Sequence, residues 1–292
     1  MPNINQTLYT ALITPLNNDS SLDIVSFKHL LQQQSDAGNG VVLLGSTGEG
    51  ANLPLDIRKQ VLEIACESFP DLAVIVGVGG IQLEETLSWL SYCETLAISA
   101  YLMVNPVYAK PGTHGQIAWF SALMDHVTKP CMLYNVPSRT SVAITTEAFQ
   151  GLLGHKNFWA VKEASGDPQQ FATWSQQFPE LKWYSGDDLL IFEHVKTAAA
   201  GLISVASNIW PQQTADLVTA LMQSNQPRIP IDTWKKASLS LFVASNPVPT
   251  KRYLAESGEI ETNIMCLPLS PLDCPDISAI EQSSKEIAAC LT

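Results

Sequence analysis

A lysine stands inside a short apolar segment of the sequence, a setting in which lysine is rare. Lys162 lies near the middle of residues 158–165, FWAVKEAS. A buried ammonium normally has a partner, so two structural interpretations are open: Lys162 pairs with Glu49 or Glu163, or its side chain reaches the edge of the fold. The functional interpretation is that burial favours the neutral amine, which can attack a carbonyl and form a Schiff base.

A phenol and a guanidinium close another apolar segment. Tyr134 and Arg139 are five residues apart, on either side of Pro137. A phenol near an amine can relay protons while a carbinolamine forms and dehydrates, and a guanidinium binds a carboxylate through two hydrogen bonds. The structural alternative for Tyr134 is a core aromatic residue whose hydroxyl is hydrogen-bonded.

Three other apolar segments also end in candidate residues. The segment Gly45–Gly50, GSTGEG, surrounds Ser46 and Thr47 with glycines, and its backbone N–H groups could hold an anion or simply form a flexible turn. Tyr108 lies on a proline-bounded loop, and Gly186 would allow a ligand to approach the backbone closely.

These candidates follow segments that read as buried parallel strands. Eight short runs are apolar almost throughout rather than alternating, and most are separated by stretches of helical periodicity. The runs begin near residues 10, 40, 72, 99, 131, 158, 181 and 201. This pattern predicts an α/β fold, a (β/α)8 TIM barrel, whose active site lies at the carboxyl ends of the strands. A doubly wound open sheet is the alternative, but the chain lacks a G-x-G-x-x-G after its first strand.

The chain divides into a barrel and a helical extension. We predict that residues 1–225 form the catalytic barrel and that residues 226–292 form a small C-terminal helical extension after a Pro-rich break. Helices are predicted over residues 23–37, 55–68, 84–96, 116–127, 145–153 and 212–224 of the barrel, and over 234–243, 249–257 and 275–290 of the extension.

Composition limits the classes of partner. Sixteen Lys and Arg against 28 Asp and Glu give a net charge of −12, which disfavours nucleic acid and anionic membranes. No apolar run approaches the about 18 residues that a membrane span needs. Six cysteines without a C-x-x-C pair and five histidines without H-x-x-H predict a cytoplasmic protein with no metal site. Only 15% of residues are charged, which favours self-association through uncharged surface.

The chain resembles the dihydrodipicolinate synthase family of pyruvate-dependent class I aldolases and lyases. The resemblance rests on Lys162, Tyr134, Arg139 and the glycine-rich loop. The resemblance extends from residues 10–15, TALITP, to residues 246–249, NPVP. It implies that Lys162 forms the Schiff base with pyruvate and that Tyr134 and Ser46 relay protons.

The remaining site residues are likewise implied by the resemblance. Tyr108 matches a second relay tyrosine that reaches into the neighbouring subunit, so a homodimer or homotetramer is expected. Thr47 lies where backbone amides bind the carboxylate of pyruvate, and Gly186 and Ile203 match positions that line the pyruvate pocket.

Arg139 distinguishes between two branches of the family. Synthases use an arginine here to hold aspartate semialdehyde, whereas N-acetylneuraminate lyases lack it; Ser46 points weakly toward the lyases. The resemblance therefore implies condensation of pyruvate with aspartate semialdehyde to 4-hydroxy-tetrahydrodipicolinate, on the route to lysine, without a cofactor. A different pyruvate-dependent aldolase and a non-catalytic pyruvate-binding protein remain as alternatives.

Feedback inhibition by lysine is expected to be weak or absent. In lysine-inhibited relatives a cleft between subunits carries polar side chains. Here the matching positions are Gly50, Leu55, Arg58, Ile81, Glu85 and Val107. Of these, Glu85 alone keeps a suitable carboxylate, and the aliphatic side chains cannot bond the charged groups of lysine.

Overall fold

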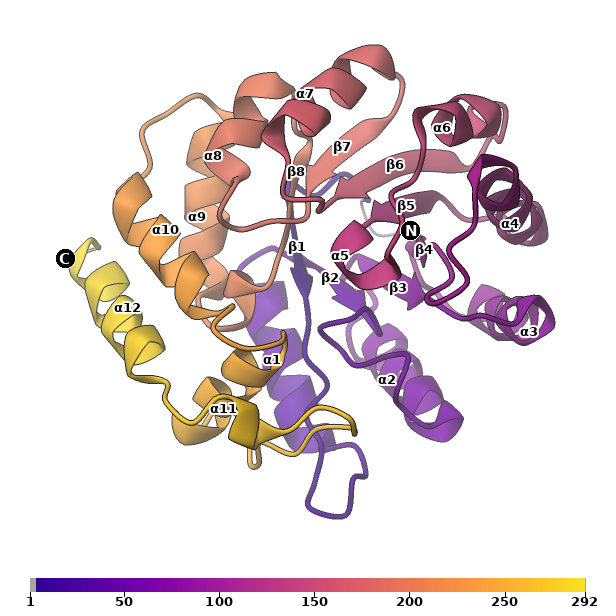
Figure 1. Ribbon diagram of the computed structural model, residues 1–292. Coiled ribbons are helices and arrows are strands. Elements are labelled where there is room, and N and C mark those ends of the chain that lie inside the picture. Colours follow the sequence, from indigo (N-terminus) through magenta and orange to yellow (C-terminus); the bar gives the residue numbers. More distant parts are fainter. Residues whose placement is uncertain (1–3, 292) are drawn as a thin grey trace.

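The computed structural model describes residues 4–291, and in this range eight parallel strands close into a barrel. Each strand pairs with its neighbours in the sequence, and β1 pairs with β8 (Figure 1). The strands are β1 (Leu8–Ala11), β2 (Gly40–Leu43), β3 (Val74–Val78), β4 (Ala100–Val104), β5 (Cys131–Asn135), β6 (Phe158–Glu163), β7 (Lys182–Ser185) and β8 (Gly201–Ser204). The (β/α)8 prediction is confirmed, because strands buried on both faces are apolar throughout.

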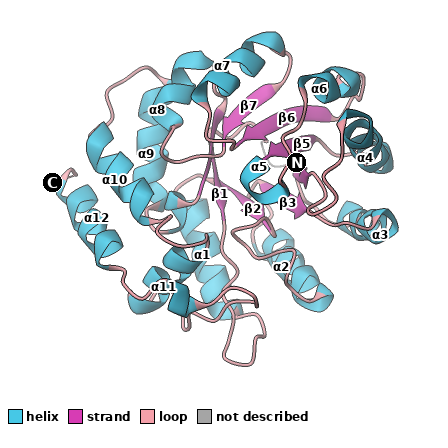
Figure 2. Cartoon of the chain, viewed as in Figure 1, coloured by secondary structure: helices cyan, strands magenta, loops and turns pink. Residues whose placement is uncertain are grey.

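Helices form a ring around the strands (Figure 2). In the barrel these are α1 (Ile24–Asp36), α2 (Leu55–Ser68), α3 (Leu83–Glu94), α4 (Thr113–His126), α5 (Pro137–Thr140), α6 (Thr146–Leu152), α7 (Pro168–Gln177), α8 (Ile191–His194) and α9 (Pro211–Met222), with 3-10 turns η1 (Val195–Thr197) and η2 (Ala206–Asn208). Local caps set several starts: Asp23 accepts a hydrogen bond from the Ser26 amide, and Thr145 accepts one from the Ala148 amide. The predicted helices match observed ones, whereas the sequence pattern did not single out α5, α7 or α8.

Three helices follow the barrel and pack against one side of it. They are α10 (Ile231–Ser240), α11 (Val248–Glu256) and α12 (Ser278–Ala289), with the turn η3 (Pro271–Asp273) between the last two. Figure 1 shows α10 and α12 side by side outside the ring. Trp210 of the barrel and Trp234 of α10 have ring centroids 6.5 Å apart, and both belong to one apolar cluster. The extension therefore shares a core with the barrel wall.

The inside of the barrel is filled by a separate layer of side chains. Tyr9, Tyr184, Ala160 and Ile203 belong to this interior cluster. The Tyr9 and Tyr184 rings meet edge to face at 5.9 Å, and their hydroxyls donate to backbone carbonyls of residues 4 and 6. These hydrogen bonds lie at the amino-terminal end of the barrel, and the ligand site of this fold lies at the opposite end.

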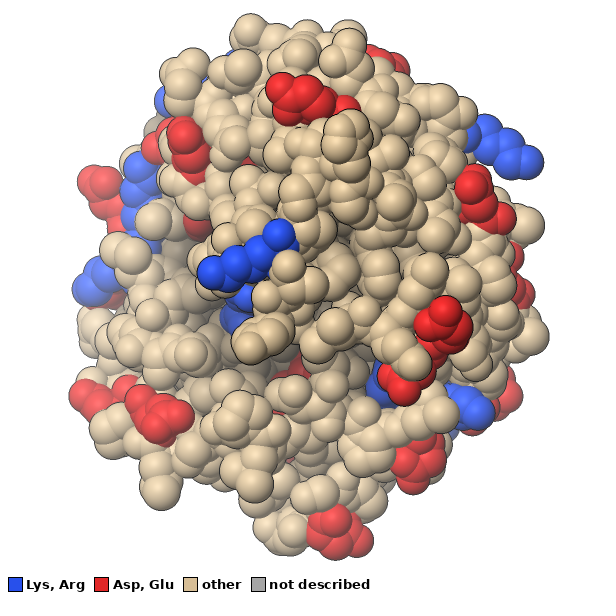
Figure 3. All heavy atoms as spheres, turned by 45° about the vertical axis from the view of Figure 1, so that its right-hand side comes forward, with Lys and Arg blue, Asp and Glu red and all other residues tan. Residues whose placement is uncertain are grey.

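The surface is poor in charge. On the face shown in Figure 3, uncharged residues cover most of the area, and Lys, Arg, Asp and Glu occur in small separate groups. In the described part of the chain, no helix is both long and apolar enough to cross a membrane.

Candidate active site

Lys162 lies near the carboxyl end of β6 with its side chain inside the barrel. Its residue exposure is 5%, and it follows Ala160 of the interior cluster by two positions, so both side chains point inward. The Nζ atom lies 4.4 Å from the ring centroid of Tyr134 on the neighbouring strand β5. Tyr134 itself packs against the interior cluster, and strand pairing sets it directly opposite Lys162. The amine and the phenol ring are therefore in contact.

Gly186 supplies the space that the lysine side chain occupies. It follows β7, and its amide donates to the Glu163 carbonyl at 2.7 Å. A Cβ atom on Gly186 would lie 2.9 Å from Lys162 Cε and 2.7 Å from Ala164 Cβ. Because real Cβ atoms do not approach so closely, only glycine fits beside Lys162 without moving it. The next residue, Asp187, has its pKa raised by burial.

The sequence left open a pairing of Lys162 with Glu49 or Glu163, and the structure gives these carboxylates other partners. Glu49 forms an ion pair with Lys251, with Oε1 to Nζ at 2.7 Å and both side chains fully buried. Glu163 accepts hydrogen bonds from Asn135 and from the Ser165 amide. Among the described residues no salt bridge is formed by Lys162, so it is a buried amine beside an aromatic ring.

The glycine-rich loop after β2 is an ordered turn. The Glu49 amide donates to the Ser46 carbonyl, and the Gly50 amide donates to the Gly45 carbonyl. The Ser46 and Thr47 amides take no part in these two hydrogen bonds, and the Ser46 side chain is half-buried while Thr47 is buried. The loop is thus held by backbone hydrogen bonds and carries a hydroxyl at each of two adjacent positions.

Asn246 joins this loop to Arg139. Its Nδ2 donates to Thr47 Oγ1 at 2.9 Å, and its carbonyl oxygen accepts from Arg139 Nη2 at 3.2 Å. Arg139 lies on α5, directly after β5, and its side chain is exposed. Both the hydroxyl loop and the guanidinium are therefore held by one residue of the segment between α10 and α11.

Two of the predicted site residues, Ile203 and Tyr108, are not among the residues shown in contact with Lys162. Ile203 is buried in the interior cluster, where it pairs with Tyr9 across β1 and β8. Tyr108 is 91% exposed and has a φ of 70°. The fold brings Lys162, Tyr134 and Gly186 into contact, but it does not bring Tyr108 to them.

Sequence reasoning did not single out Asn246 and Lys251, which contact Thr47 and Glu49 of the glycine-rich loop. Both belong to the extension, where the only local signal was the segment NPVP at residues 246–249. A buried carboxylate needs a cationic partner, so the expected burial of Glu49 was a signal to look for a second buried lysine, which is Lys251.

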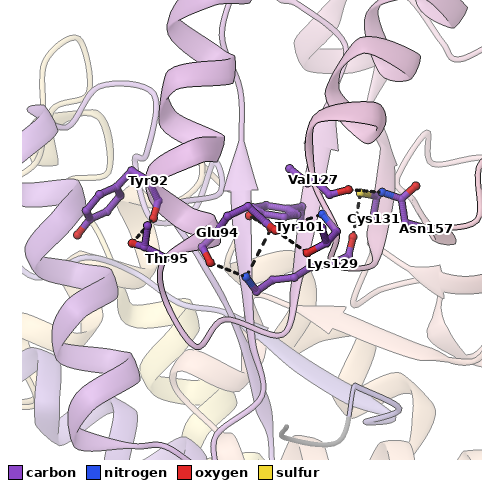
Figure 4. Close-up of polar contacts among 9 residues, drawn as sticks. Tyr92, Glu94, Thr95, Tyr101, Val127, Lys129, Cys131 and Asn157 are labelled. Carbon is purple, nitrogen blue, oxygen red and sulfur yellow. Dashed lines mark hydrogen bonds and ion pairs between the residues drawn. The ribbon is translucent and has the colours of Figure 1, made fainter.

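The opposite end of the barrel carries a polar cluster of a different kind. Glu94 accepts hydrogen bonds from Tyr101 Oη at 2.6 Å and from Thr128, and Lys129 Nζ donates to the Glu94 carbonyl at 3.1 Å (Figure 4). Burial opposes ionisation of Glu94, but the hydrogen bonds from Thr128 and Tyr101 outweigh it and hold the pKa of Glu94 below its usual value. This cluster ties α3 to the starts of β4 and β5, so its role is structural.

Metal ligands are not grouped in the described structure. Between residues 4 and 291, no set of three His, Cys, Asp or Glu side chains lies close enough to hold a metal ion.

Comparison with known proteins identifies the family. The model of the dihydrodipicolinate synthetase family matches residues 5–286. Two curated relatives are named 4-hydroxy-tetrahydrodipicolinate synthase. The protein of Francisella philomiragia is 43% identical, with 95% of this chain and 94% of the relative covered, and that of Wolbachia pipientis from Culex pipiens is 41% identical, with 96% and 95% covered.

Solved structures agree with the sequence comparison. The 4-hydroxy-tetrahydrodipicolinate synthase of Methylacidiphilum fumariolicum superposes with a TM-score of 0.92 at 28% identity, covering 98% of this chain and 97% of that one. A second neighbour, described as a monomeric dihydrodipicolinate synthase variant, has a TM-score of 0.88 at 28% identity, with 97% of each chain covered. With a family model matching nearly its whole length and relatives above 40% identity, the chain belongs to the dihydrodipicolinate synthetase family.

Proposed function

We propose that this protein condenses pyruvate with L-aspartate 4-semialdehyde to 4-hydroxy-tetrahydrodipicolinate through a Schiff base at Lys162. The observation that carries the proposal is the buried Lys162 amine, 4.4 Å from the Tyr134 ring and unpaired with either neighbouring carboxylate. Membership of the family and the names of the relatives support the same reaction.

The first half of the reaction converts pyruvate into a nucleophile. The neutral Lys162 amine adds to the C2 carbonyl of pyruvate, giving a carbinolamine. Loss of water yields the iminium, with Tyr134 delivering the proton to the departing hydroxyl. Removal of a proton from C3 then gives the enamine. The Ser46 hydroxyl passes protons between Tyr134 and the second tyrosine of the relay, and the Thr47 amide holds the carboxylate of pyruvate.

The second half forms the carbon–carbon bond and releases the lysine. C3 of the enamine attacks the aldehyde carbon of the semialdehyde, and the aldehyde oxygen takes up a proton to become a hydroxyl. The amino group of the second substrate then adds to C2, and Lys162 leaves as the free amine when the ring closes. Arg139 binds the carboxylate of the semialdehyde at the mouth of the barrel, which orients the aldehyde toward the enamine.

Trapping with borohydride tests the first half directly. Pyruvate plus borohydride should add a reduced pyruvyl group to the peptide that contains Lys162, and Lys162→Ala should abolish the adduct. An unmodified Lys162 peptide in the wild-type protein would contradict the proposal and would favour a protein that binds pyruvate without catalysis.

A coupled assay with aspartate semialdehyde tests the second half. Arg139→Ala should lower kcat/KM for the semialdehyde by about 10- to 100-fold, because hydrogen bonds to charged groups are worth about 1.5–3 kcal/mol, while pyruvate trapping persists. Turnover only of sugar keto-acids would identify another aldolase of the family.

Tyr108 supports an oligomeric enzyme. Its side chain is 91% exposed and shares the carboxyl end of the barrel with exposed Leu55, Ile81 and Val107. We infer that Tyr108 completes the proton relay of a neighbouring subunit in a homodimer or homotetramer. Mixed oligomers of Tyr108→Phe and Lys162→Ala subunits should then regain activity that neither variant has alone; a monomer in sedimentation with full activity would exclude this arrangement.

The six cysteines are free thiols, which suits the reducing conditions of the cytoplasm, where we place the reaction.

A further inference from the structure

A buried hydrogen bond joins the carboxyl ends of the two strands that carry Tyr134 and Lys162. Asn135 Nδ2 donates to Glu163 Oε2 at 2.6 Å, and the two residues are 0% and 1% exposed. Asn135 directly follows Tyr134, and Glu163 directly follows Lys162. The backbone register sets Tyr134 opposite Lys162 and Asn135 opposite Glu163.

The remaining oxygen atoms of this pair are also satisfied. Asn135 Oδ1 accepts from the Ile144 amide at 2.9 Å, and Glu163 Oε1 accepts from the Ser165 amide at 2.7 Å. Burial raises the pKa of Glu163, and none of its hydrogen-bond donors is a cation. The Glu163 carboxylate is therefore held by neutral N–H donors. Each of these donors has a single acceptor oxygen within this group.

The side chains of Glu163 and Lys162 lie on opposite faces of strand β6. Successive side chains of a strand point to opposite faces, so Lys162 faces the interior and Glu163 faces the surrounding helices. The backbone at this point is held as well: the Ala164 amide donates to the Asn135 carbonyl at 2.9 Å, and the Gly186 amide donates to the Glu163 carbonyl at 2.7 Å. Glu163 thus acts on Lys162 through the strand and does not touch the reacting atoms.

The pairing of β5 with β6 contains an irregularity before it reaches this hydrogen bond. Cys131 pairs with Phe158, but Met132 pairs with Ala160, so Trp159 is an extra residue in β6. A bulge leaves one residue unpaired and bends its strand. A pairing shifted by one residue beyond it would turn Lys162 out of the barrel. The Asn135–Glu163 hydrogen bond lies beyond the bulge, immediately next to the reacting pair.

We propose that Glu163, together with Asn135, is a positioning residue that keeps Lys162 against Tyr134 by fixing the register of β5 and β6 after the bulge. The proposal rests on the Schiff-base function of Lys162. It assigns a role to a carboxylate that is adjacent to the lysine in sequence yet takes no part in proton transfer.

Exchanging the two side chains provides the test. In Glu163→Gln an amide N–H₂ must face either Asn135 Nδ2 or the Ser165 amide, so one donor always opposes another. In Asn135→Asp two carboxyl groups face each other and the N–H donor between them is lost. In the double variant the amide introduced on β6 donates to the carboxylate introduced on β5. The Ile144 and Ser165 amides keep their acceptors, so all the hydrogen bonds return and the net charge is unchanged.

The measured quantity is the rate of borohydride-trappable imine formation at Lys162, per folded molecule. Each single variant should lower this rate and kcat by about tenfold or more, because each loses one buried hydrogen bond. The double variant should restore both quantities to within about twofold of the wild-type values. Single variants with unchanged rates, or a double variant as slow as the singles, would overturn the proposal.

A control separates positioning from stability. Thr214 is fully buried in α9, and its hydroxyl donates to the Trp210 carbonyl at 2.6 Å, so Thr214→Val also removes one buried hydrogen bond. It should lower Tm and leave imine formation unchanged. Failure of the wild-type protein to form any adduct would refute the proposed function itself, whereas an adduct that forms equally fast in Glu163→Gln would refute only the role of Glu163.

Discussion

Lys251 and Glu49 form an ion pair in which neither side chain has any exposed surface. The Nζ and Oε1 atoms are 2.7 Å apart. Lys251 also donates to the Ile264 carbonyl, and Glu49 Oε2 accepts from the Cys266 amide. Burial lowers the pKa of Lys251, and the adjacent Glu49 carboxylate opposes this effect. The pair connects α11 of the extension to the loop that carries Ser46.

We expect Lys251→Met to destabilise the protein strongly. The substitution leaves the Glu49 carboxylate buried and unpaired, which costs about 3–5 kcal/mol of unfolding free energy, and the Ser46 loop should lose its anchor, so that kcat falls as well. Urea unfolding monitored by circular dichroism gives the free energy.

A second pair serves as the control for this prediction. Lys235 and Glu193 are 2.9 Å apart, but their side chains are 34% and 31% exposed. Lys235→Met should therefore cost less than about 1 kcal/mol. Equal losses of unfolding free energy in Lys251→Met and Lys235→Met would show that burial does not set the cost of breaking the ion pair.

Gly186→Ala should slow Schiff-base formation while leaving most of the fold intact. The added Cβ would lie 2.9 Å from Lys162 Cε, and relieving such overpacking costs about 1–3 kcal/mol, so the amine must move. Trapping with pyruvate and borohydride should slow by about tenfold. Gly154→Ala is the matched control, because nothing lies within 4 Å of its added Cβ; normal trapping in Gly186→Ala would contradict the steric argument.

Stability should fall as the medium becomes acidic, in part through His194. This side chain is buried, stacks on Phe171 at 4.0 Å and contacts Ser185 Oγ through Nδ1 at 2.8 Å. Burial lowers its pKa to about 4, against the weaker opposing effect of Glu193. The pKa of His194 is higher in the unfolded chain, at about 6.5. The stabilisation from the neutral, buried imidazole is therefore complete above about pH 6.5 and is lost as the pH falls toward 4.

His194→Gln isolates that contribution. Between pH 6.5 and pH 4, the unfolding free energy of the wild type should drop by about 2–3 kcal/mol more than that of the variant. Urea titrations at a series of pH values measure the difference. Parallel pH curves for the two proteins would mean that His194 is not the titrating group.

L-lysine should have little effect on the rate. Leu55, Ile81 and Val107 are aliphatic and exposed, and they offer no side-chain hydrogen bond to either charged end of lysine. The Arg58 guanidinium lies over the Trp89 ring, 4.0 Å from its centroid. Initial rates should stay constant up to millimolar L-lysine, and an inhibition constant in the micromolar range would show that another part of this surface binds it.

Much of the fold follows from local sequence. Each buried strand is an apolar run of four to six residues, and their repetition with helices between them was enough to predict the barrel and the position of Lys162 within β6. The chain order of the strands is also their order around the barrel, so no long-range pairing had to be guessed. The short helices α5 and α8 escaped because four residues carry almost no periodicity.

The partners of the buried polar groups could not be predicted in this way. The sequence suggested Glu49 and Glu163 as partners for Lys162, but Glu49 pairs with a lysine 202 positions away and Glu163 with an asparagine 28 positions away. Thr47 meets Asn246 across 199 positions. Spacing along a chain gives the face of an element on which a side chain lies, and it does not give the distant segment that returns to cover that face.

The sequence by itself therefore determined that a lysine stands in a buried strand of a barrel, because apolar periodicity is a local property. The tertiary structure decided that this lysine is free of carboxylates, that Tyr134 lies 4.4 Å away, and that the extension holds the loop of Ser46 and Arg139. The physical reason is that a buried charge takes whichever partner the folded chain brings within about 3 Å, and that partner is fixed by packing of elements far apart in sequence.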